Sequence, residues 1–246
     1  MHVPVTAREV RSRAPFIASQ VGLVLLGVFI YFLVRGLTES AEDVAVAHAR
    51  DLVAFEQAIG IHVEPDMQSW IEPSSLLVTI ANWIYIWGHW PVIIATMIWL
   101  VALHRRVFLR LRDAMLVSGA LGMLVFVSYP VAPPRLAGLG LVDTVTERSR
   151  AYRVLQPPAF VDQYAAMPSL HSGWDLLVGM SIVAAASTVW LRMVGFALPV
   201  LMTFAVIVTA NHYIVDVVAG IALVLIGYAV ALQLERRRDH RQSGAP

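Results

Sequence analysis

Six long apolar runs constrain this chain more than any other feature of its sequence. They cover residues 16–34, 76–103, 114–129, 171–190, 193–211 and 214–234. A helix of about 20 apolar residues crosses the roughly 30 Å hydrocarbon core of a bilayer. The chain is also 58% hydrophobic and only 14% charged, which leaves too little polar surface to cover a soluble globule of this size. The sequence therefore predicts an all-α, polytopic membrane helix bundle with six transmembrane helices.

Charges between the runs orient the predicted bundle. Segment 35–75 carries eight acidic residues against two arginines, as expected for an outer segment. Cytoplasmic flanks of membrane helices are rich in arginine, so both termini are predicted to be cytoplasmic, in a bacterial plasma membrane. Four clusters of arginine then share the inner side: Arg8, Arg11 and Arg13; Arg105, Arg106, Arg110 and Arg112; Arg192; and Arg236, Arg237, Arg238 and Arg241.

Two further features complete the predicted organisation. Run 76–103 is long and contains Pro91, which predicts a kink or a tilt, whereas run 114–129 is short. Segment 42–59 predicts an amphipathic helix on the outer face, either in the interface or as a cap over the bundle. Its apolar positions are Ala45, Leu52, Phe55 and Ile59, with Glu42, Asp43, Asp51 and Glu56 on other faces.

The whole chain, 1–246, is predicted to form a single membrane domain. A catalytic core covers about 76–234, and 1–75 contribute the N-terminal span and the interfacial helix. Because the chain has no cysteine, disulfides and thiolate chemistry are excluded, which leaves histidines and carboxylates as candidate reactive groups. All basic residues are arginine, and no nucleic-acid partner is predicted.

Three separated segments carry the candidate chemistry. They are 129–135 (YPVAPPR), 167–173 (MPSLHSG) and 211–216 (NHYIVD). On the predicted topology all three reach the outer face, a convergence that did not enter the assignment of the spans. Ionisable side chains near membrane depth are costly and mark functional sites.

His212 and Asp216 are four residues apart, which places them on one face of a helix. A carboxylate on one ring nitrogen leaves the other nitrogen free to attack an electrophile or move a proton. The same pair could instead satisfy two polar groups in a bundle.

His171 follows Ser169 at a predicted helix start, where free backbone N–H groups favour an anion. Arg135, in a proline-rich turn, offers a rigid fork for phosphate oxygens. Each residue also has a simpler interpretation. The Pro-Ser pair could merely start a helix in which His171 is incidental, and Arg135 could be an interfacial arginine at the end of a span.

These motifs resemble the type 2 phosphatidic acid phosphatase superfamily. Segments 168–172 and 212–216 look like its second and third motifs, and 130–135 is similar to a degenerate first motif. The forms Met-Pro-Ser-Leu-His and His-Tyr-x-x-Asp are more similar to inositol phosphorylceramide synthases and sphingomyelin synthases than to the soluble acid phosphatases. Segment 82–89 is similar to the Asn, Tyr and His that precede the core in that branch.

The resemblance implies a lipid phosphatase or phosphotransferase that needs no metal and no cofactor. His212 would be the nucleophile that forms a phosphohistidine, Asp216 would orient it, and His171 would protonate the leaving group. Arg135, with Ser169 and Ser172 at the helix start, would hold the phosphate. Asp175, Tyr213 and His89 are candidate outer-shell residues, although Asp175 is expected rather to cap a helix that begins at Ser172.

Two cations of the superfamily are missing here. Position 128 is Ser where the first motif has Lys, and position 206 is Val where the third motif commonly has Arg. Fewer cations suit a phosphodiester or diphosphate better than a monoester dianion.

The predicted partners are the membrane and a lipid phosphate or phospholipid. Three other functions stay open. The first is a transporter with His171, His212 and Asp216 as a proton relay. The second is a metal site made from the same three residues, with His89 as a further candidate ligand. The third is a scaffolding membrane protein.

Overall fold

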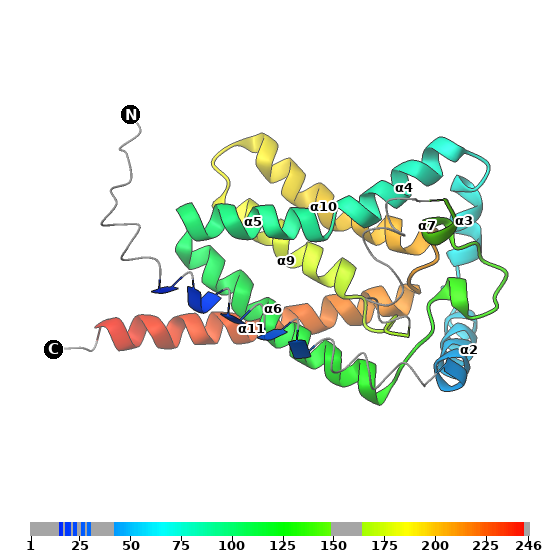
Figure 1. The fold of residues 1–246 in the computed structure, drawn as a ribbon, viewed down its shortest axis with the longest axis horizontal. Helices are drawn as coiled ribbons and strands as arrows, with labels where there is room; N and C mark the ends of the chain where they lie inside the picture. The colour runs from blue at the N-terminus through cyan, green and yellow to red at the C-terminus, as the bar shows by residue number, and fades with distance from the viewer. Residues whose placement is uncertain are drawn as a thin grey trace.

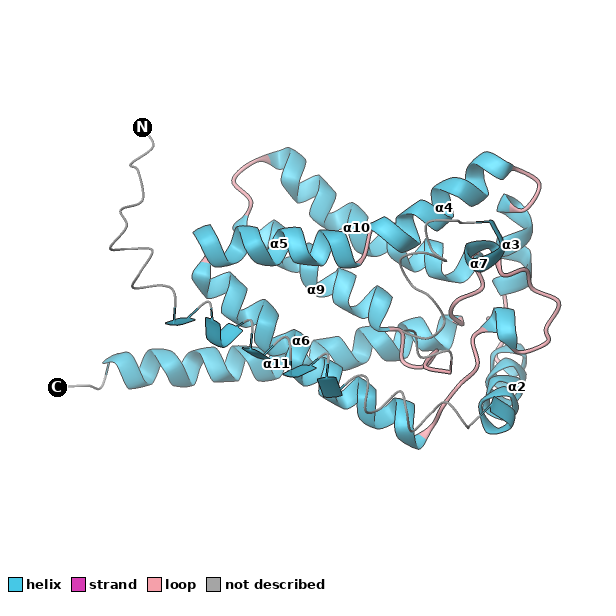
Figure 2. Cartoon of the chain, viewed as in Figure 1, coloured by secondary structure: helices cyan, strands magenta, loops and turns pink. Residues whose placement is uncertain are grey.

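The computed structural model describes residues 42–148, residues 164–243 and several separate residues between 15 and 30. These parts are helices joined by loops and turns (Figure 2). The described residues contain no strand, and Val131 and Ala165 form an isolated parallel bridge. The chain is thus all-helical where it is described. The predicted span 16–34 falls largely outside the described residues.

The predicted second span is present as two helices. α4 (Ser75–Trp87) and α5 (Trp90–Leu103) are bent by 42° at the break between them. Pro91 lies in the first turn of α5, where its missing N–H costs no intrahelical bond. The predicted kink is therefore confirmed, and it lies just before the proline.

The next predicted boundaries were wrong. α6 (Arg105–Ser128) begins at Arg105, not at residue 114, so the arginine cluster 105–112 lies in a helix and not in a loop. Arg110 and Arg112 are held there by carboxylates, with Arg110 Nε 2.8 Å from Glu235 and Arg112 Nη2 2.5 Å from Asp113. Ion pairs thus stabilise a first part of α6 that a hydropathy pattern does not predict.

The last three long helices are α9 (Leu170–Ala185), α10 (Val189–Val208) and α11 (Ile214–Ser243). α9 ends before the predicted residue 190, because Thr188 caps α10 by accepting from the Leu191 N–H. Arg192 consequently lies inside α10 and not in a connecting loop.

Within the described residues, three helices, α6, α10 and α11, are long and apolar enough to cross a membrane, or four if the bent α4–α5 pair counts as one span. α9, with 16 residues, is a shorter apolar helix. Large apolar side chains are exposed on these helices, among them Ile98, Leu124, Phe196 and Val200. Such a surface is typical of an integral membrane protein.

Close helix packing forms the core. α11 packs against α6 and α9, and α10 packs against α9, around Leu111, Leu177 and Val224. Gly179 of α9 and Gly195 of α10 face each other so closely that a Cβ on either would overlap the other's carbonyl oxygen. Small residues at helix crossings are the usual means of close approach in membrane proteins.

Short helices gather at one end of this bundle. Figure 1 shows α2 (Glu42–Ala58), α3 (Glu64–Ile71) and α7 (Thr144–Arg148) at the end opposite the C-terminal end of α11. α2 differs from the predicted amphipathic helix, because Phe55 and Ile59 are exposed and Glu56 is fully buried. The prediction that Glu56 lies on a polar face was wrong, since its carboxylate binds the backbone of α11.

Candidate active site

Backbone hydrogen bonds join the three motif segments at the α2 end of the bundle. The loop after α6 pairs with the chain before α9, with the Val131 N–H donating to the Tyr164 carbonyl at 2.8 Å. The start of α9 is tied to α11, because the Ser169 N–H donates to the Asp216 carbonyl at 2.9 Å. The predicted convergence of the motifs is therefore present in the fold.

His212 lies in the turn between α10 and α11 and is buried. Its Nδ1 lies 2.8 Å from the carbonyl oxygen of Ala166. A carbonyl can only accept, so Nδ1 must carry the proton. The Nε2 atom of the neutral ring then has a free lone pair, as a nucleophile requires.

Asp216 approaches the same Nδ1 atom from the first turn of α11. Its Oδ2 atom is 3.5 Å from His212 Nδ1, beyond an ordinary hydrogen bond, and accepts from the Tyr213 N–H at 2.9 Å. The second oxygen of this fully buried carboxylate has no hydrogen-bond partner. The predicted His-Asp neighbours are close in space, but Ala166, a backbone acceptor, makes the shorter contact.

His171 lies in the first turn of α9, where contacts with other aromatic rings hold its side chain. Its ring stacks on Tyr85 at 4.8 Å and lies 4.3 Å from the ring of His89. The centroid of the His212 ring is 5.6 Å away. Two imidazoles, one from the start of α9 and one from the turn before α11, can serve a single phosphorus atom as nucleophile and acid.

A second His-carboxylate pair supports this stack. His89 is buried at the break between α4 and α5, and its Nδ1 lies 2.9 Å from Asp175 Oδ1. Asp175 is therefore not the helix cap expected from the sequence, since α9 begins at Leu170 with Ser169 as its N-cap. A separation of 86 residues left no sequence signal for the pairing.

The serines at the start of α9 are buried and contact each other. Ser169 accepts from the Ser172 N–H at 3.4 Å and so caps the helix, and the two hydroxyl oxygens are also 3.4 Å apart. A Cβ on Gly220 of α11 would overlap the Ser169 carbonyl oxygen. The glycine thus brings the α9 start against the helix that carries Asp216.

Arg135 lies beside the histidine turn. Its Nη1 donates to Asn211 Oδ1 at 2.6 Å, and its Nε lies 3.2 Å from Asp143 Oδ2. Asn211 directly precedes His212, so the guanidinium group and the ring share one turn of chain. The motifs assign no role to Asn211 or Asp143, yet both side chains position the guanidinium group.

Two buried glutamates hold the first turn of α11. Glu64 accepts from the Ile214 N–H at 2.8 Å, and Glu56 accepts from the Val215 N–H at 2.9 Å. Burial raises the pKa of Glu56 to about 8, although the Val215 N–H opposes the shift. Carboxylates at a helix N-terminus are favoured by the helix dipole, but the sequence does not show which helix they meet.

Tyr213, between His212 and α11, is fully buried. Its hydroxyl donates to the Ala132 carbonyl at 3.1 Å, so the motif after α6 is tied to the histidine turn. Burial also raises the pKa of this phenol, which keeps it a donor. Tyr213 is thus a structural member of the site.

The metal reading of the histidine cluster finds no support in the described part of the chain. In that part, a group of three side chains does have its potential ligand atoms within 4.8 Å of one another. It consists of Glu56, His62 and Glu64 and does not include His171, His212 or His89.

The comparisons with known proteins agree with the motifs. A family model described as PAP2 superfamily, the type 2 phosphatidic acid phosphatases, matches residues 50–230. No curated protein and no solved structure matches the chain. The match covers most of the chain, including the three motif segments, and fits a phosphatase or phosphotransferase of lipid phosphoesters. The chain therefore belongs to the PAP2 superfamily.

Proposed function

We propose that this protein is an integral membrane enzyme that cleaves a lipid phosphoester through a phosphohistidine on His212. The observation that carries the proposal is the hydrogen bond between His212 Nδ1 and the Ala166 carbonyl. It leaves Nε2 unprotonated beside a second imidazole, that of His171.

In the first step, Nε2 of His212 attacks phosphorus and the bond from phosphorus to the leaving oxygen breaks. His171, protonated at this stage, gives its proton to that oxygen. The new positive charge on His212 is stabilised by the Asp216 carboxylate 3.5 Å from Nδ1. No metal and no cofactor takes part in this step.

In the second step, water or a lipid alcohol attacks the phosphohistidine. The P–N bond breaks, and His171 takes the proton of the attacking hydroxyl, which restores both histidines. Water gives a phosphatase, and an alcohol gives a transferase. Arg135, held by Asn211 and Asp143, compensates the negative charge of the phosphoryl oxygens, together with the helix start at Ser169 and Ser172.

A phosphodiester, as in the synthase-like branch, is the proposed substrate class. Position 128 is an exposed serine bonded to its own helix, and Val206 is fully buried in an apolar cluster. Neither position supplies a cation, so a less highly charged phosphoryl group suits the site better.

We further propose six transmembrane helices, with α2 covering the outer end of the bundle. Both termini are then cytoplasmic, and the site faces the outer side of the plasma membrane. The arginines of α6 and α11 at the opposite end from α2 support this orientation. Lipid substrate reaches the site laterally from the bilayer.

The decisive experiment compares purified wild type with His212→Ala in detergent. Phosphatidic acid, a prenyl diphosphate and phosphatidylinositol are offered in parallel, with and without EDTA, at a temperature well below unfolding. Turnover that survives EDTA and disappears in His212→Ala supports the proposal, and the preferred lipid identifies the substrate class.

His104→Ala is the control, because His104 lies at the junction of α5 and α6. Undiminished turnover in His212→Ala would refute the nucleophile. If the wild type turns over none of these lipids but moves protons in vesicles, the transporter reading would replace the enzyme.

A further inference from the structure

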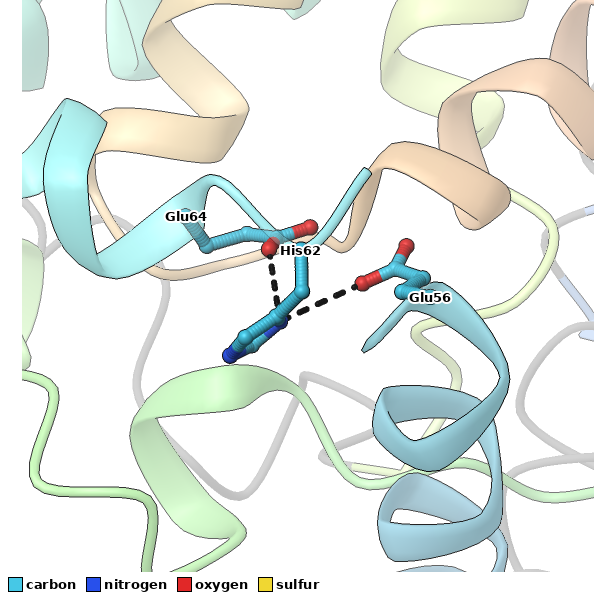
Figure 3. A group of neighbouring side chains, drawn as sticks. All are labelled: Glu56, His62 and Glu64. Atoms are coloured by element: carbon cyan, nitrogen blue, oxygen red, sulfur yellow. Dashed lines mark ion pairs between the residues drawn. The ribbon is translucent and has the colours of Figure 1, made fainter. Parts of the chain in front are cut away.

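Glu56, His62 and Glu64 form a second cluster, distinct from the proposed reacting histidines. Figure 3 shows the three side chains pointing toward one another from the end of α2 and the start of α3. His62 Nδ1 lies 3.0 Å from Glu64 Oε2 and 3.6 Å from Glu56 Oε2. One oxygen of each carboxylate and one imidazole nitrogen thus lie around a common position.

The two carboxylate oxygens of each glutamate make different contacts. The Oε1 atoms accept from the N–H groups of Ile214 and Val215. The Oε2 atoms turn toward His62, and neither they nor His62 Nδ1 has a hydrogen-bond partner. Both glutamates are 0% exposed. Three ligand atoms that pair only with one another are therefore directed at one buried position.

Among the described residues, the ion-pair partner of Glu56 and Glu64 is His62, and no arginine pairs with either glutamate. Buried carboxylates are costly unless they are paired or coordinate a metal. Asp216, which accepts from the Tyr213 N–H in the same turn of α11, adds a third buried carboxylate. A cation between the three ligand atoms would compensate this charge.

The distances fit a small divalent cation. Zinc binds imidazole nitrogen at about 2.0–2.1 Å and carboxylate oxygen at about 2.0–2.2 Å, so tetrahedral ligands lie about 3.4 Å apart. The measured separations of 3.0 and 3.6 Å lie on either side of this value. Three protein ligands leave a fourth position for water, and the His62 side chain, 17% exposed, leaves a path from solvent.

We propose that Glu56, His62 and Glu64 bind a divalent transition metal of the zinc type, which ties α2 and α3 to the first turn of α11. The metal takes no part in phosphoryl transfer. It stabilises the turn that carries His212, because both carboxylate ligands also bind the backbone two and three residues after that histidine.

Zinc binding to the untagged, full-length protein in detergent tests the proposal. We expect wild type to retain one zinc per chain after dialysis, measured by elemental analysis, and to bind zinc more tightly than magnesium or calcium in calorimetry. Glu64→Gln and His62→Gln should weaken zinc binding by about 100-fold or more, since each removes a ligand atom. His104→Ala is the matched histidine control and should bind zinc as wild type does.

Thermal unfolding gives a second measurement. EDTA should lower the melting temperature of wild type and added zinc should restore it, whereas EDTA should leave His62→Gln unchanged. If Glu64→Gln does not fold, His62→Gln still decides, because it keeps both backbone hydrogen bonds of the glutamates. His212→Ala separates this site from the proposed function, since it should lose turnover and keep its zinc.

Two results would overturn the proposal. One is wild type with no zinc above the level of His62→Gln. The other is a melting temperature that does not respond to EDTA and zinc. In either case a proton shared between His62 and the glutamates, and no metal, would balance the cluster.

Discussion

The Nδ1 atom of His212 lies 2.8 Å from the carbonyl oxygen of Ala166 and 3.5 Å from the nearer carboxylate oxygen of Asp216. The backbone therefore determines which ring nitrogen carries the proton, and the carboxylate contributes its charge from further away. In a triad where the carboxylate alone orients the ring, that carboxylate has both roles. The division of roles here leads directly to a prediction.

Asp216→Asn should lower kcat by about 10²-fold with little change in KM. The variant removes the negative charge that stabilises the imidazolium, but the Ala166 carbonyl keeps the tautomer. Loss of the tautomer in a carboxylate-oriented triad costs about 10⁴-fold. Steady-state kinetics on the preferred lipid measure the effect. A loss as large as that of His212→Ala would show that the carboxylate, and not the carbonyl, orients the ring.

His171→Ala should affect substrates according to their leaving group. A general acid contributes about 10²–10⁴-fold when the leaving oxygen needs a proton, so kcat for an alkyl ester should fall by that factor. A nitrophenyl ester with the same phosphoryl group leaves as an anion and should be affected far less. Parallel assays of the two esters measure the ratio. Equal losses on both would contradict the acid role and leave His171 as a packing residue between Tyr85 and His89.

Gly220→Ala should destabilise the fold and lower activity. The added Cβ would overlap the Ser169 carbonyl oxygen, and relief requires the start of α9 to move away from α11. Overpacking of this kind costs about 1–3 kcal/mol of unfolding free energy. Melting temperature and kcat of the purified variant measure both effects. Gly27→Ala is the matched control, because a Cβ at Gly27 meets nothing within 4 Å, and equal behaviour of the two variants would refute the contact.

The stability of metal-free protein should decrease as pH rises from about 4.5 to about 8. Burial raises the pKa of Glu56 from 4.5 to about 8, so the folded state keeps a proton that the unfolded state has lost in this window. Unfolding free energy then falls with rising pH and levels off above the folded pKa. Glu56→Gln keeps an acceptor for the Val215 N–H and should remove this part of the slope. Melting temperatures at several pH values in EDTA test it, and identical slopes in both proteins would contradict the assignment.

Hydropathy and motif spacing were enough to predict the helical membrane architecture and the superfamily of this protein. Apolar runs predict the helices because a bilayer requires about 20 apolar residues per span, and α6, α10 and α11 are such helices. Three short motifs predict the superfamily, since their side chains, among them His171, His212 and Asp216, are candidate reactive groups. Helix ends were predicted less well, because ion pairs such as Arg110 with Glu235 extend helices beyond their apolar runs.

Only the tertiary structure decided which groups meet across long sequence separations. The Ala166 carbonyl at His212, Asp175 at His89 and Asn211 at Arg135 are hydrogen-bond partners chosen by helix packing. A backbone carbonyl has no residue type that a sequence pattern could reveal. Glu56 and Glu64 look like solvent-facing charges in the sequence, yet packing of α2 and α3 against α11 buries both. Residue types and local spacing set the available chemistry, whereas close packing, which depends on distant segments at once, set the geometry in which it can act.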